Sequence, residues 1–341
     1  MKVSLYKSRI VFFLLFILAL SSCQTTDDYR PAVKSTSEVL LSWNQGAAKQ
    51  AIINFVKRVS DPASSDYIKP AGRVAVFDND GTLWAEQPLY FQIYFIFDQI
   101  RAKAAEHPDW KNKQPFKAVL ENDTDFIKSM PLADIFKLTD LALAGMTQTQ
   151  FEAEADDFIT RAKHPERGVL LTQMVYQPML ELLDYLHQHQ FKVFIVSGGG
   201  IDFIRAFSEE IYGIPKENVI GSAFQTEFVK QDKRTDLMRT TTYVQPFNDK
   251  EGKPVNLYRY IGRRPILAFG NSDGDLQMLQ YAAGGQSPAL MMLMHHDDAE
   301  REWAYDRKSP IGHLDKALDE AQARGWTVVS IKNDFKQVFP N

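Results

Sequence analysis

Five short, mainly apolar runs along the chain have the pattern of buried β-strands. They span residues 74–77, 192–196, 266–269, 289–294 and 326–331. Continuous apolar runs of this length are typical of strands that are buried on both faces of a parallel sheet. Helical patterns separate the runs, among them one from Pro178 to about His189 that leads into the second run. Strands that alternate with helices predict an α/β fold with a doubly wound, Rossmann-like parallel sheet.

The region between the first two predicted strands has a different pattern. From Ala85 to about Tyr176 it has apolar residues at helical spacing, for example over 91–100 and 151–163, and no convincing strand. We therefore predict that a block of helices is inserted between the first and second strands of the sheet.

Two carboxylates follow the first predicted strand directly. Asp78 and Asp80 are separated by one residue, and Gly81 and Thr82 after them suit a tight turn. Active sites of open α/β sheets lie beyond the carboxyl ends of the strands. Two acids at this place can bind a hard cation, and one can attack a phosphorus atom while the other transfers a proton. The alternative is a pair of acids that only caps the turn.

A serine and three glycines follow the second predicted strand. The segment from Ser197 to Gly200 leads into a helical pattern at 201–205. A hydroxyl group and bare backbone N–H groups at the start of a helix are suited to binding a phosphate oxygen. The alternative is a serine that caps the helix next to flexible glycines.

An acidic loop follows the third predicted strand and contains Asn271, Asp273 and Asp275. Oxygen atoms of such side chains can coordinate Mg²⁺. The alternative is a turn rich in Asx residues that binds nothing.

A single lysine precedes this loop at the start of a predicted helix. Lys253 follows Gly252, and the helix leads to the third predicted strand. Its ammonium group can pair with a carboxylate and neutralise a phosphoryl group. The alternative is an ordinary surface lysine, because other cationic residues lie close by in the sequence.

In their order along the chain, the four segments resemble the motifs of the haloacid dehalogenase superfamily. Their arrangement resembles its phosphoserine phosphatase-like branch. Asp80 is typical of the phosphatase and phosphotransferase members, because an alcohol leaving group must be protonated, whereas a halide need not be. The resemblance implies that Asp78 is the nucleophile, which forms an aspartyl phosphate, and that Asp80 is the general acid and base. It also implies a phosphate site made of Thr82, Ser197, Gly198 and Lys253.

The resemblance implies one Mg²⁺ ion as cofactor. Its expected ligands come from Asp78, Asp80, the backbone carbonyl of Asn79, and the loop residues Asn271, Asp273 and Asp275. The loop departs from the family pattern, because Asn271 stands where the first Asp is expected. An amide carries less charge, so either Asn271 or Asp273 is the direct ligand, and Asp275 orders a bound water or the loop.

These motifs predict a Mg²⁺-dependent phosphatase that hydrolyses small organic phosphomonoesters. Two alternatives remain open. One is a phosphotransferase or mutase that uses the same aspartyl phosphate. The other is a binding protein of the cell envelope whose catalytic site has decayed, and Asn271 is its only support.

In this superfamily an insertion between the first two motifs forms a helical cap that closes over the site and excludes water. The resemblance places this cap at 85–176 and the core domain at 46–84 and 177–341. Glu86 lies where the chain enters the cap. It is either a contact for a substrate's amino group or a carboxylate at the start of a helix.

The amino terminus resembles the signal peptide of a bacterial lipoprotein. Cationic residues precede an apolar stretch at 11–20 that is short for a membrane span, and Leu-Ser-Ser-Cys then resembles a lipobox. We expect a signal peptide at 1–22, acylation of Cys23, and a flexible tether at 23–45. Because Gln24 follows the cysteine, the resemblance implies a lipid anchor in the outer membrane, with the protein facing the periplasm of a bacterial cell envelope.

Composition limits the remaining functions. The formal net charge is −4 and no basic run is present, so no nucleic-acid partner is expected. Cys23 is the only cysteine, which excludes an intramolecular disulfide. His295 and His296, with Asp297 and Asp298 after them, are interpreted as loop structure rather than as a second metal site. The patterns predict neither the substrate nor the oligomeric state.

Overall fold

A seven-stranded sheet lies at the centre of the protein. The computed structural model describes residues 39–231 and 234–341. The strand order is β3-β2-β1-β6-β7-β8, and β9 also pairs with β7; all pairs are parallel except β7 with β8. The strands are β1 (Val74–Phe77), β2 (Lys192–Gly200), β3 (Val219–Ser222), β6 (Leu267–Gly270), β7 (Leu290–Asp297), β8 (Ala304–Tyr305) and β9 (Thr327–Ser330). All five predicted strands are present, and the predicted α/β fold is confirmed.

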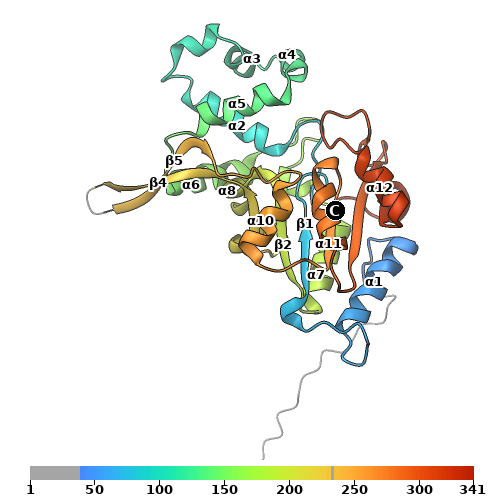
Figure 1. Ribbon diagram of the computed structural model, residues 1–341. Helices are drawn as coiled ribbons and strands as arrows, with labels where there is room; N and C mark the ends of the chain where they lie inside the picture. Colours follow the sequence, from blue (N-terminus) through green and yellow to red (C-terminus); the bar gives the residue numbers. More distant parts are fainter. Residues whose placement is uncertain (1–38, 232–233) are drawn as a thin grey trace, which may run out of the picture. The chain divides into compact units, whose positions relative to one another are not determined.

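The α-helices mostly lie between these strands in the sequence (Figure 1). They are α1 (Ala47–Ser60), α2 (Phe91–Lys103), α3 (Phe116–Glu121), α4 (Thr124–Ser129), α5 (Leu132–Leu143), α6 (Gln148–Arg161), α7 (Gln177–Gln188), α8 (Ile201–Arg205), α9 (Ser208–Tyr212), α10 (Gly252–Ile261), α11 (Leu276–Ala283), α12 (Lys316–Arg324) and α13 (Ile331–Asp334). In the part of the chain that the structure describes, no helix is long and apolar enough to cross a membrane.

Helices pack on both faces of the sheet, which explains why its strands are apolar throughout. Val74 and Val76 of β1 pack in one cluster with side chains of α10, α11 and α12. Ala75 and Phe77 belong to a second cluster, which includes side chains of α1 and α7. Successive side chains of a strand point to opposite faces, so a strand that is covered on both sides has no polar face.

A block of helices separates β1 from β2, as predicted. The segment contains α2 to α6, and no β-strand is assigned within residues 85–176. Phe95 of α2 packs against Phe151 and Phe158 of α6, with ring centroids 5.4 Å apart in both pairs, and against Phe203 of α8 at 5.4 Å. Aromatic packing therefore joins this block to the helix that follows β2. The boundaries of a separate cap domain at 85–176 stay a prediction.

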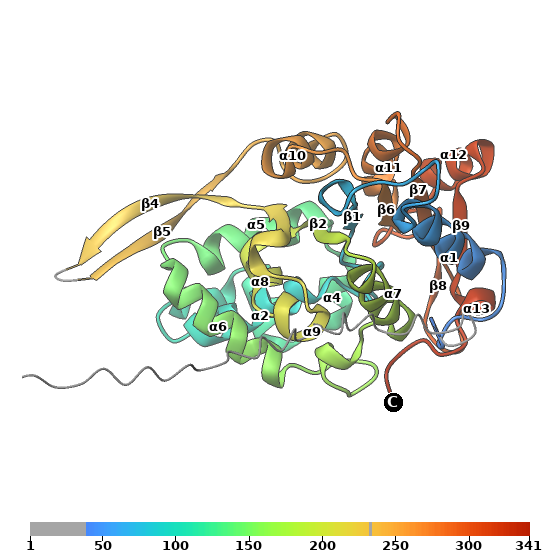
Figure 2. The same ribbon diagram turned by 90° about the horizontal axis from the view of Figure 1, so that it is seen from below.

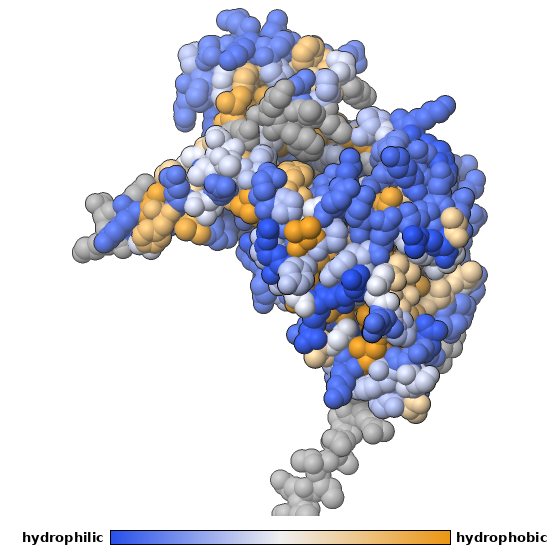
Figure 3. All heavy atoms as spheres, viewed as in Figure 1, coloured by the Kyte–Doolittle hydropathy of each residue, from blue (hydrophilic) through white to orange (hydrophobic). Residues whose placement is uncertain are grey.

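An antiparallel hairpin of β4 (Phe224–Gln231) and β5 (Arg234–Tyr243) has no counterpart among the predicted strands. Its residues are mainly polar and form no continuous apolar run. Figure 2 shows that the hairpin extends away from the sheet. Apolar side chains are visible on the hairpin in Figure 3. The cross-strand partners Phe228 and Leu237 are 71% and 38% exposed.

The base of this hairpin is held by Arg239 of β5. Its guanidinium group forms an ion pair with Asp202 of α8 at 2.6 Å and lies 4.0 Å from the ring centroid of Phe151 in α6. The Arg239 side chain is 5% exposed. A buried cation that is both paired and stacked fixes the hairpin base against the helical block.

The structure corrects two predictions near the ends of elements. Leu40 and Trp43 are buried, and Trp43 Nε1 donates to the carbonyl of Pro178 at 2.8 Å, so residues 39–45 are not part of a flexible tether. The predicted signal peptide, Cys23 and the rest of the tether lie outside the described residues. His295 and His296 belong to β7 rather than to a loop, because the strand continues to Asp297 and pairs there with β8.

Candidate active site

Asp78 and Lys253 form a buried ion pair at the carboxyl end of β1. This strand pairs with β2 on one side and with β6 on the other, so the strand order reverses at β1. Such a switch point is where open α/β sheets form their binding crevice. Lys253 Nζ donates to Asp78 Oδ1 at 2.8 Å and to the carbonyl of Val196 in β2 at 2.8 Å. The lysine thereby links β1, β2 and α10.

Asp275 shares the same ammonium group and orders the loop after β6. Lys253 Nζ donates to Asp275 Oδ1 at 2.5 Å, and the Asp275 side chain is fully buried. Asp275 Oδ2 accepts hydrogen bonds from the backbone N–H groups of Asn271 and Ser272 at 3.0 and 3.1 Å. Both of its oxygens are therefore engaged within the protein, in keeping with the expectation that Asp275 orders the loop.

The electrostatics of this trio favour a charged lysine. Burial lowers the pKa of Lys253, but the carboxylates of Asp275 and Asp78 raise it more, and the net direction is upward. Burial and the nearby Asp275 raise the pKa of Asp78, while Lys253 lowers it, and again the net direction is upward. A cation bound beside Asp78 would favour its ionised form.

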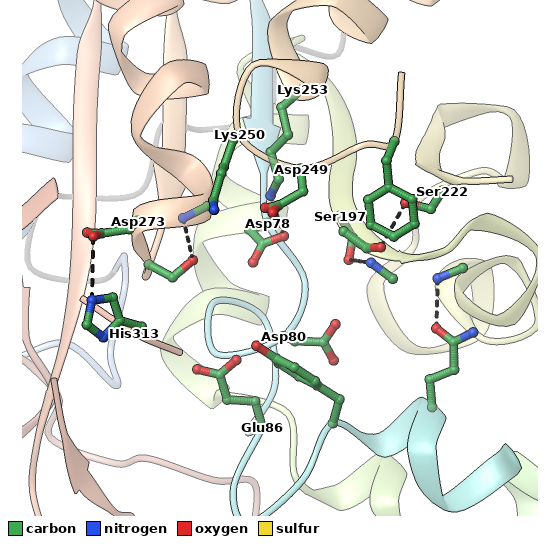
Figure 4. A pocket seen from close by; sticks show the side chains of 18 of the residues that line it. Asp78, Asp80, Glu86, Ser197, Ser222, Asp249, Lys250, Lys253, Asp273 and His313 are labelled. Atoms are coloured by element: carbon green, nitrogen blue, oxygen red, sulfur yellow. Dashed lines mark hydrogen bonds and ion pairs between the residues drawn. The ribbon is translucent and has the colours of Figure 1, made fainter. Parts of the chain in front are cut away.

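Asp80 lies in the same cavity as Asp78 (Figure 4). The indole Nε1 of Trp84 donates to Asp80 Oδ1 at 2.8 Å, which fixes the carboxyl group and leaves Oδ2 to hold a proton. Burial raises the pKa of Asp80, and the hydrogen bond from Trp84 lowers it by less. A raised pKa suits a group that must donate a proton near neutral pH.

Ser197 and the glycines after it line the cavity opposite these acids. The backbone N–H of Gly199 donates to Ser197 Oγ at 3.0 Å. Two distant side chains hold this segment: Asn248 Nδ2 donates to the carbonyl of Ser197 at 2.8 Å, and Gln92 Oε1 accepts from the N–H of Gly200 at 2.7 Å. Asn248 and Gln92 have no motif of their own in the sequence, and only the fold brings them here.

Thr82, Asn271 and Glu86 form a connected group beside the cavity. Thr82 Oγ1 donates to Asn271 Oδ1 at 3.2 Å, and Asn271 Nδ2 donates to Glu86 Oε1 at 2.7 Å. Thr82 is completely buried and its hydroxyl group donates to Asn271, so it positions Asn271 rather than facing a phosphate. Glu86 does line the cavity.

Asp273 is turned away from Asp78 and points toward His313 (Figure 4). Asp273 Oδ1 accepts hydrogen bonds from the N–H groups of Asp315 and Ala317, both at 2.9 Å, and Oδ2 accepts from the N–H of Lys316 at 3.2 Å. These groups surround the start of α12. The side chain therefore satisfies free N–H groups at a helix N-terminus, a role that a carboxylate fills well.

The cavity has a volume of about 710 Å³, which exceeds what a phosphate group alone needs. Beyond the acids and the serine loop, its wall includes aromatic side chains at the base of the hairpin, namely Phe224, Tyr243 and Phe247. The rings of Phe224 and Tyr243 lie 4.2 Å apart, and those of Tyr243 and Phe247 lie 5.5 Å apart. The site therefore has a polar end at the strands and an apolar end at the hairpin.

The polar end has the chemistry of a Mg²⁺ site. Within 39–231 and 234–341, no three His, Cys, Asp or Glu side chains form a cluster that could hold a metal by themselves. Mg²⁺ does not require such a cluster, because it usually takes one or two carboxylates and completes its shell with water and substrate phosphate. Asp78 and Asp80 can supply carboxylate oxygens and Asn271 an amide oxygen, with Glu86 behind Asn271. The donor set fits the ion.

Fold and site together place a buried carboxylate–lysine pair and a second carboxyl group at the switch point of a parallel α/β sheet. Residues 75–280 match the family model described as haloacid dehalogenase-like hydrolase. The match covers more than half of the chain, and the protein belongs to this family. A search of curated proteins finds no match.

Several solved structures are similar to this chain at low identity. A conserved protein of unknown function from Anaerococcus prevotii is 16% identical, with a TM-score of 0.49 over 83% of this chain and 90% of that one. Cytosolic 5'-nucleotidase IIIB bound to cytidine is 13% identical, with a TM-score of 0.44 over 83% and 84%. A probable phosphoserine phosphatase from Vibrio cholerae is 16% identical, with a TM-score of 0.37 over 78% and 62%.

Proposed function

We propose that this hydrolase is a Mg²⁺-dependent phosphatase that acts on small organic phosphomonoesters. The observation that carries the proposal is the ion pair of Asp78 with Lys253, together with Asp80 in the same cavity. Hydrolysis of a carbon–halogen bond needs no acid for its leaving group, whereas cleavage of a phosphate ester does. Two carboxylates with separate hydrogen-bond partners can divide the roles of nucleophile and proton donor.

The contacts support a proposed atom for each role. Asp78 Oδ1 is held by Lys253, so Oδ2 is the oxygen that attacks phosphorus and forms the aspartyl phosphate. Asp80 donates the proton on Oδ2 to the departing alkoxide, then accepts a proton from the water that hydrolyses the intermediate. Ser197 Oγ and the N–H group of Gly198 bind phosphate oxygens, whereas the N–H groups of Gly199 and Gly200 already donate to Ser197 and Gln92. Lys253 keeps the Asp78 carboxylate in place and offsets negative charge.

Mg²⁺ supplies charge neutralisation between carboxylate and phosphate when it is bound. Asp78, Asp80 and Asn271 are the residues that would hold it, with Glu86 beside them. Lys253, Trp84 and Asp275 fix the positions of these groups in the protein alone. The active site is therefore largely organised by the chain itself.

The test is phosphate release by the purified protein from a panel of phosphomonoesters, with Mg²⁺ or with EDTA. We expect turnover that depends on Mg²⁺, and a loss of about a thousandfold or more in kcat for Asp78→Asn, because the nucleophile is gone. Turnover that persists in EDTA, or in Asp78→Asn, would contradict the proposal. Transfer of the phosphoryl group to an added alcohol rather than to water would identify a phosphotransferase instead. A folded protein that turns over no ester would favour an envelope binding protein.

The lipobox-like sequence supports a further part of the proposal, a lipid anchor on Cys23 that holds the enzyme in the bacterial cell envelope, facing the periplasm. Mass spectrometry of the protein from a bacterial membrane fraction tests it. A diacylglyceryl-modified N-terminal peptide that begins at Cys23 is the expected result. An unmodified Met1, or cleavage elsewhere with an unmodified Cys23, would rule the anchor out.

A further inference from the structure

Glu86 is a buried carboxylate whose hydrogen-bond partners are neutral. The residue is 2% exposed, and its Oε1 accepts hydrogen bonds from Asn271 Nδ2 at 2.7 Å and from the hydroxyl group of Tyr305 at 2.9 Å. Among the described residues, Glu86 forms no ion pair with a lysine, arginine or histidine. Burial and the nearby Asp80 raise the pKa of the Glu86 carboxyl well above its usual range, and a positive group beside it would favour the ionised form.

The backbone around Glu86 is shaped to hold its carboxylate against Asn271. Gly81 and Gly312 have positive φ angles of 73° and 63°, in the region that favours glycine. A Cβ at Gly81 would lie 2.4 Å from Glu86 Oε1 and 2.0 Å from Asn271 Nδ2, and one at Gly312 would lie 1.9 Å from Glu86 Oε1. The two glycines therefore leave space for the contact between Glu86 and Asn271, and the side chain of any other residue at either position would occupy that space.

The site contains more carboxyl groups than cations that form ion pairs with them. Asp78 and Asp275 share the single ammonium group of Lys253, whereas Asp80 and Glu86 have no ion-pair partner in the described structure. The loop after β6 carries an amide at Asn271, where the resemblance to the family motif leads us to expect an acid. Glu86 places a carboxylate within 2.7 Å of that amide, so the charge absent from position 271 is present on its neighbour.

We propose that Glu86 is the residue that compensates for Asn271 in the metal site, an inference that rests on the proposed Mg²⁺-dependent function. Glu86 acts in two ways. Its hydrogen bond commits Nδ2 of Asn271, which leaves Oδ1 as the atom that meets the cation, and Oδ1 retains a lone pair beside the bond from Thr82. Its negative charge strengthens cation binding, as carboxylates behind metal ligands commonly do.

A double substitution tests this inference through metal affinity rather than through turnover. The dissociation constant for Mn²⁺ is measured by electron paramagnetic resonance on the full chain without any ester, for wild type, Glu86→Gln, Asn271→Asp and the double variant. Glu251→Gln is the matched control, because Glu251 is an exposed carboxylate on the wall of the same cavity. Melting temperatures in EDTA establish that each variant is folded.

We expect Glu86→Gln to bind Mn²⁺ about tenfold to a hundredfold more weakly, the range typical of a lost carboxylate behind a metal ligand. The double variant exchanges carboxylate and amide between the two positions, which restores both the charge and the hydrogen bond, so its affinity should return to within about threefold of wild type. Glu251→Gln should bind as wild type does.

Four results would overturn the inference. They are wild-type affinity in Glu86→Gln, equal weakening in Glu251→Gln, no recovery in a folded double variant, and a wild-type protein that binds no Mn²⁺. A residue that only contacts the substrate would change KM for amine-containing esters and leave Mn²⁺ affinity unchanged. If the metal results hold but no ester is hydrolysed, the metal role of Glu86 stands and the proposed phosphatase function fails.

Discussion

At the scale of single residues, the contacts of Asp273 indicate a structural role rather than a catalytic one. Its two carboxylate oxygens accept three backbone hydrogen bonds at the start of α12. We expect Asp273→Ala to lower the free energy of unfolding by about 1–2 kcal/mol, as loss of a helix cap does, and to leave Mn²⁺ affinity unchanged. Chemical denaturation and metal titration of the same sample measure both quantities.

Asp273→Asn is the matched control, because it keeps one acceptor oxygen and the size of the side chain. Its loss of stability should be smaller than that of Asp273→Ala. A large loss of metal affinity in both variants, with stability unchanged, would show that Asp273 is a metal ligand and that its contacts with α12 are incidental.

His164 makes the stability of the protein depend on pH. Its Nε2 donates to the carbonyl of Gln87 at 2.8 Å, and its Nδ1 accepts from the N–H groups of Glu166 and Arg167 at 3.3 and 3.2 Å. This arrangement requires the neutral ring, and burial lowers the pKa of His164 below its usual value. Protonation of Nδ1 would remove both of these hydrogen bonds, because the new N–H group would face two other N–H donors.

Because the folded pKa lies below the unfolded one, the unfolded chain takes up a proton first as the pH falls through about 6.5. Stability is therefore complete above this pH, and it should fall by about 1.4 kcal/mol per pH unit until the folded pKa is reached. Urea denaturation at pH 7.5, 6.5 and 5.5 measures the slope. His164→Gln should be less stable at pH 7.5 and have a shallower slope. An equal slope in both proteins would exclude His164 as the source.

Some of these residues could be placed from the sequence, and others could not. Asp78, Asp80 and Ser197 directly follow apolar strands, so their place at the sheet edge followed from the pattern. The partner of Asn271 could not be found this way, because Glu86 lies 185 residues away and only the fold brings the two together. Asp273 has the spacing of a ligand, but the position of α12 decides what it contacts.

At the scale of elements, the hairpin of β4 and β5 supplies the apolar end of the cavity. Phe224 and Tyr243 pair at its base, and Phe247 follows it. We expect Phe247→Ala to lower kcat/KM about threefold to tenfold for 4-nitrophenyl phosphate and to change it little for glycerol phosphate, since an aromatic contact contributes about 0.5–1.5 kcal/mol.

The ratio of the two kcat/KM values is the measurement, because it cancels any general loss of active enzyme. Tyr258→Ala removes an aromatic side chain that is 72% exposed on α10 and is a suitable control. An equal fall for both esters would mean that Phe247 does not contact the leaving group.

Five strands of the central sheet were predictable, whereas the short strands β3 and β8 and the hairpin were not. Core strands are buried on both faces, so burial alone produces a continuous apolar run that can be recognised. The hairpin projects into solvent and is fixed mainly at its base by Arg239, so no burial pattern marks it. The same reasoning applies to Leu40 and Trp43, which are buried in a short segment that has no helical or strand period.

At the scale of the whole molecule, the order of the strands creates the site. The chain passes from β1 to β2 on one side of β1. Later in the sequence it passes from β6 to β7 on the other side. The carboxyl ends of β1, β2 and β6 therefore bring together residues from three distant segments. Lys253 pairs with Asp78 across 175 residues. The function depends on the complete α/β fold, and an isolated motif could not perform it.

The most direct test of the central claim is detection of a phosphoryl group on Asp78. Asp80→Asn keeps an acceptor for Trp84 but cannot activate water, and 4-nitrophenolate leaves without an acid. Rapid mixing of this variant with 4-nitrophenyl phosphate and Mg²⁺, acid quenching and tandem mass spectrometry should find the group on Asp78, with a matching burst of nitrophenol. A burst without modification of Asp78, or an equal burst from Asp78→Asn, would contradict an aspartyl-phosphate mechanism.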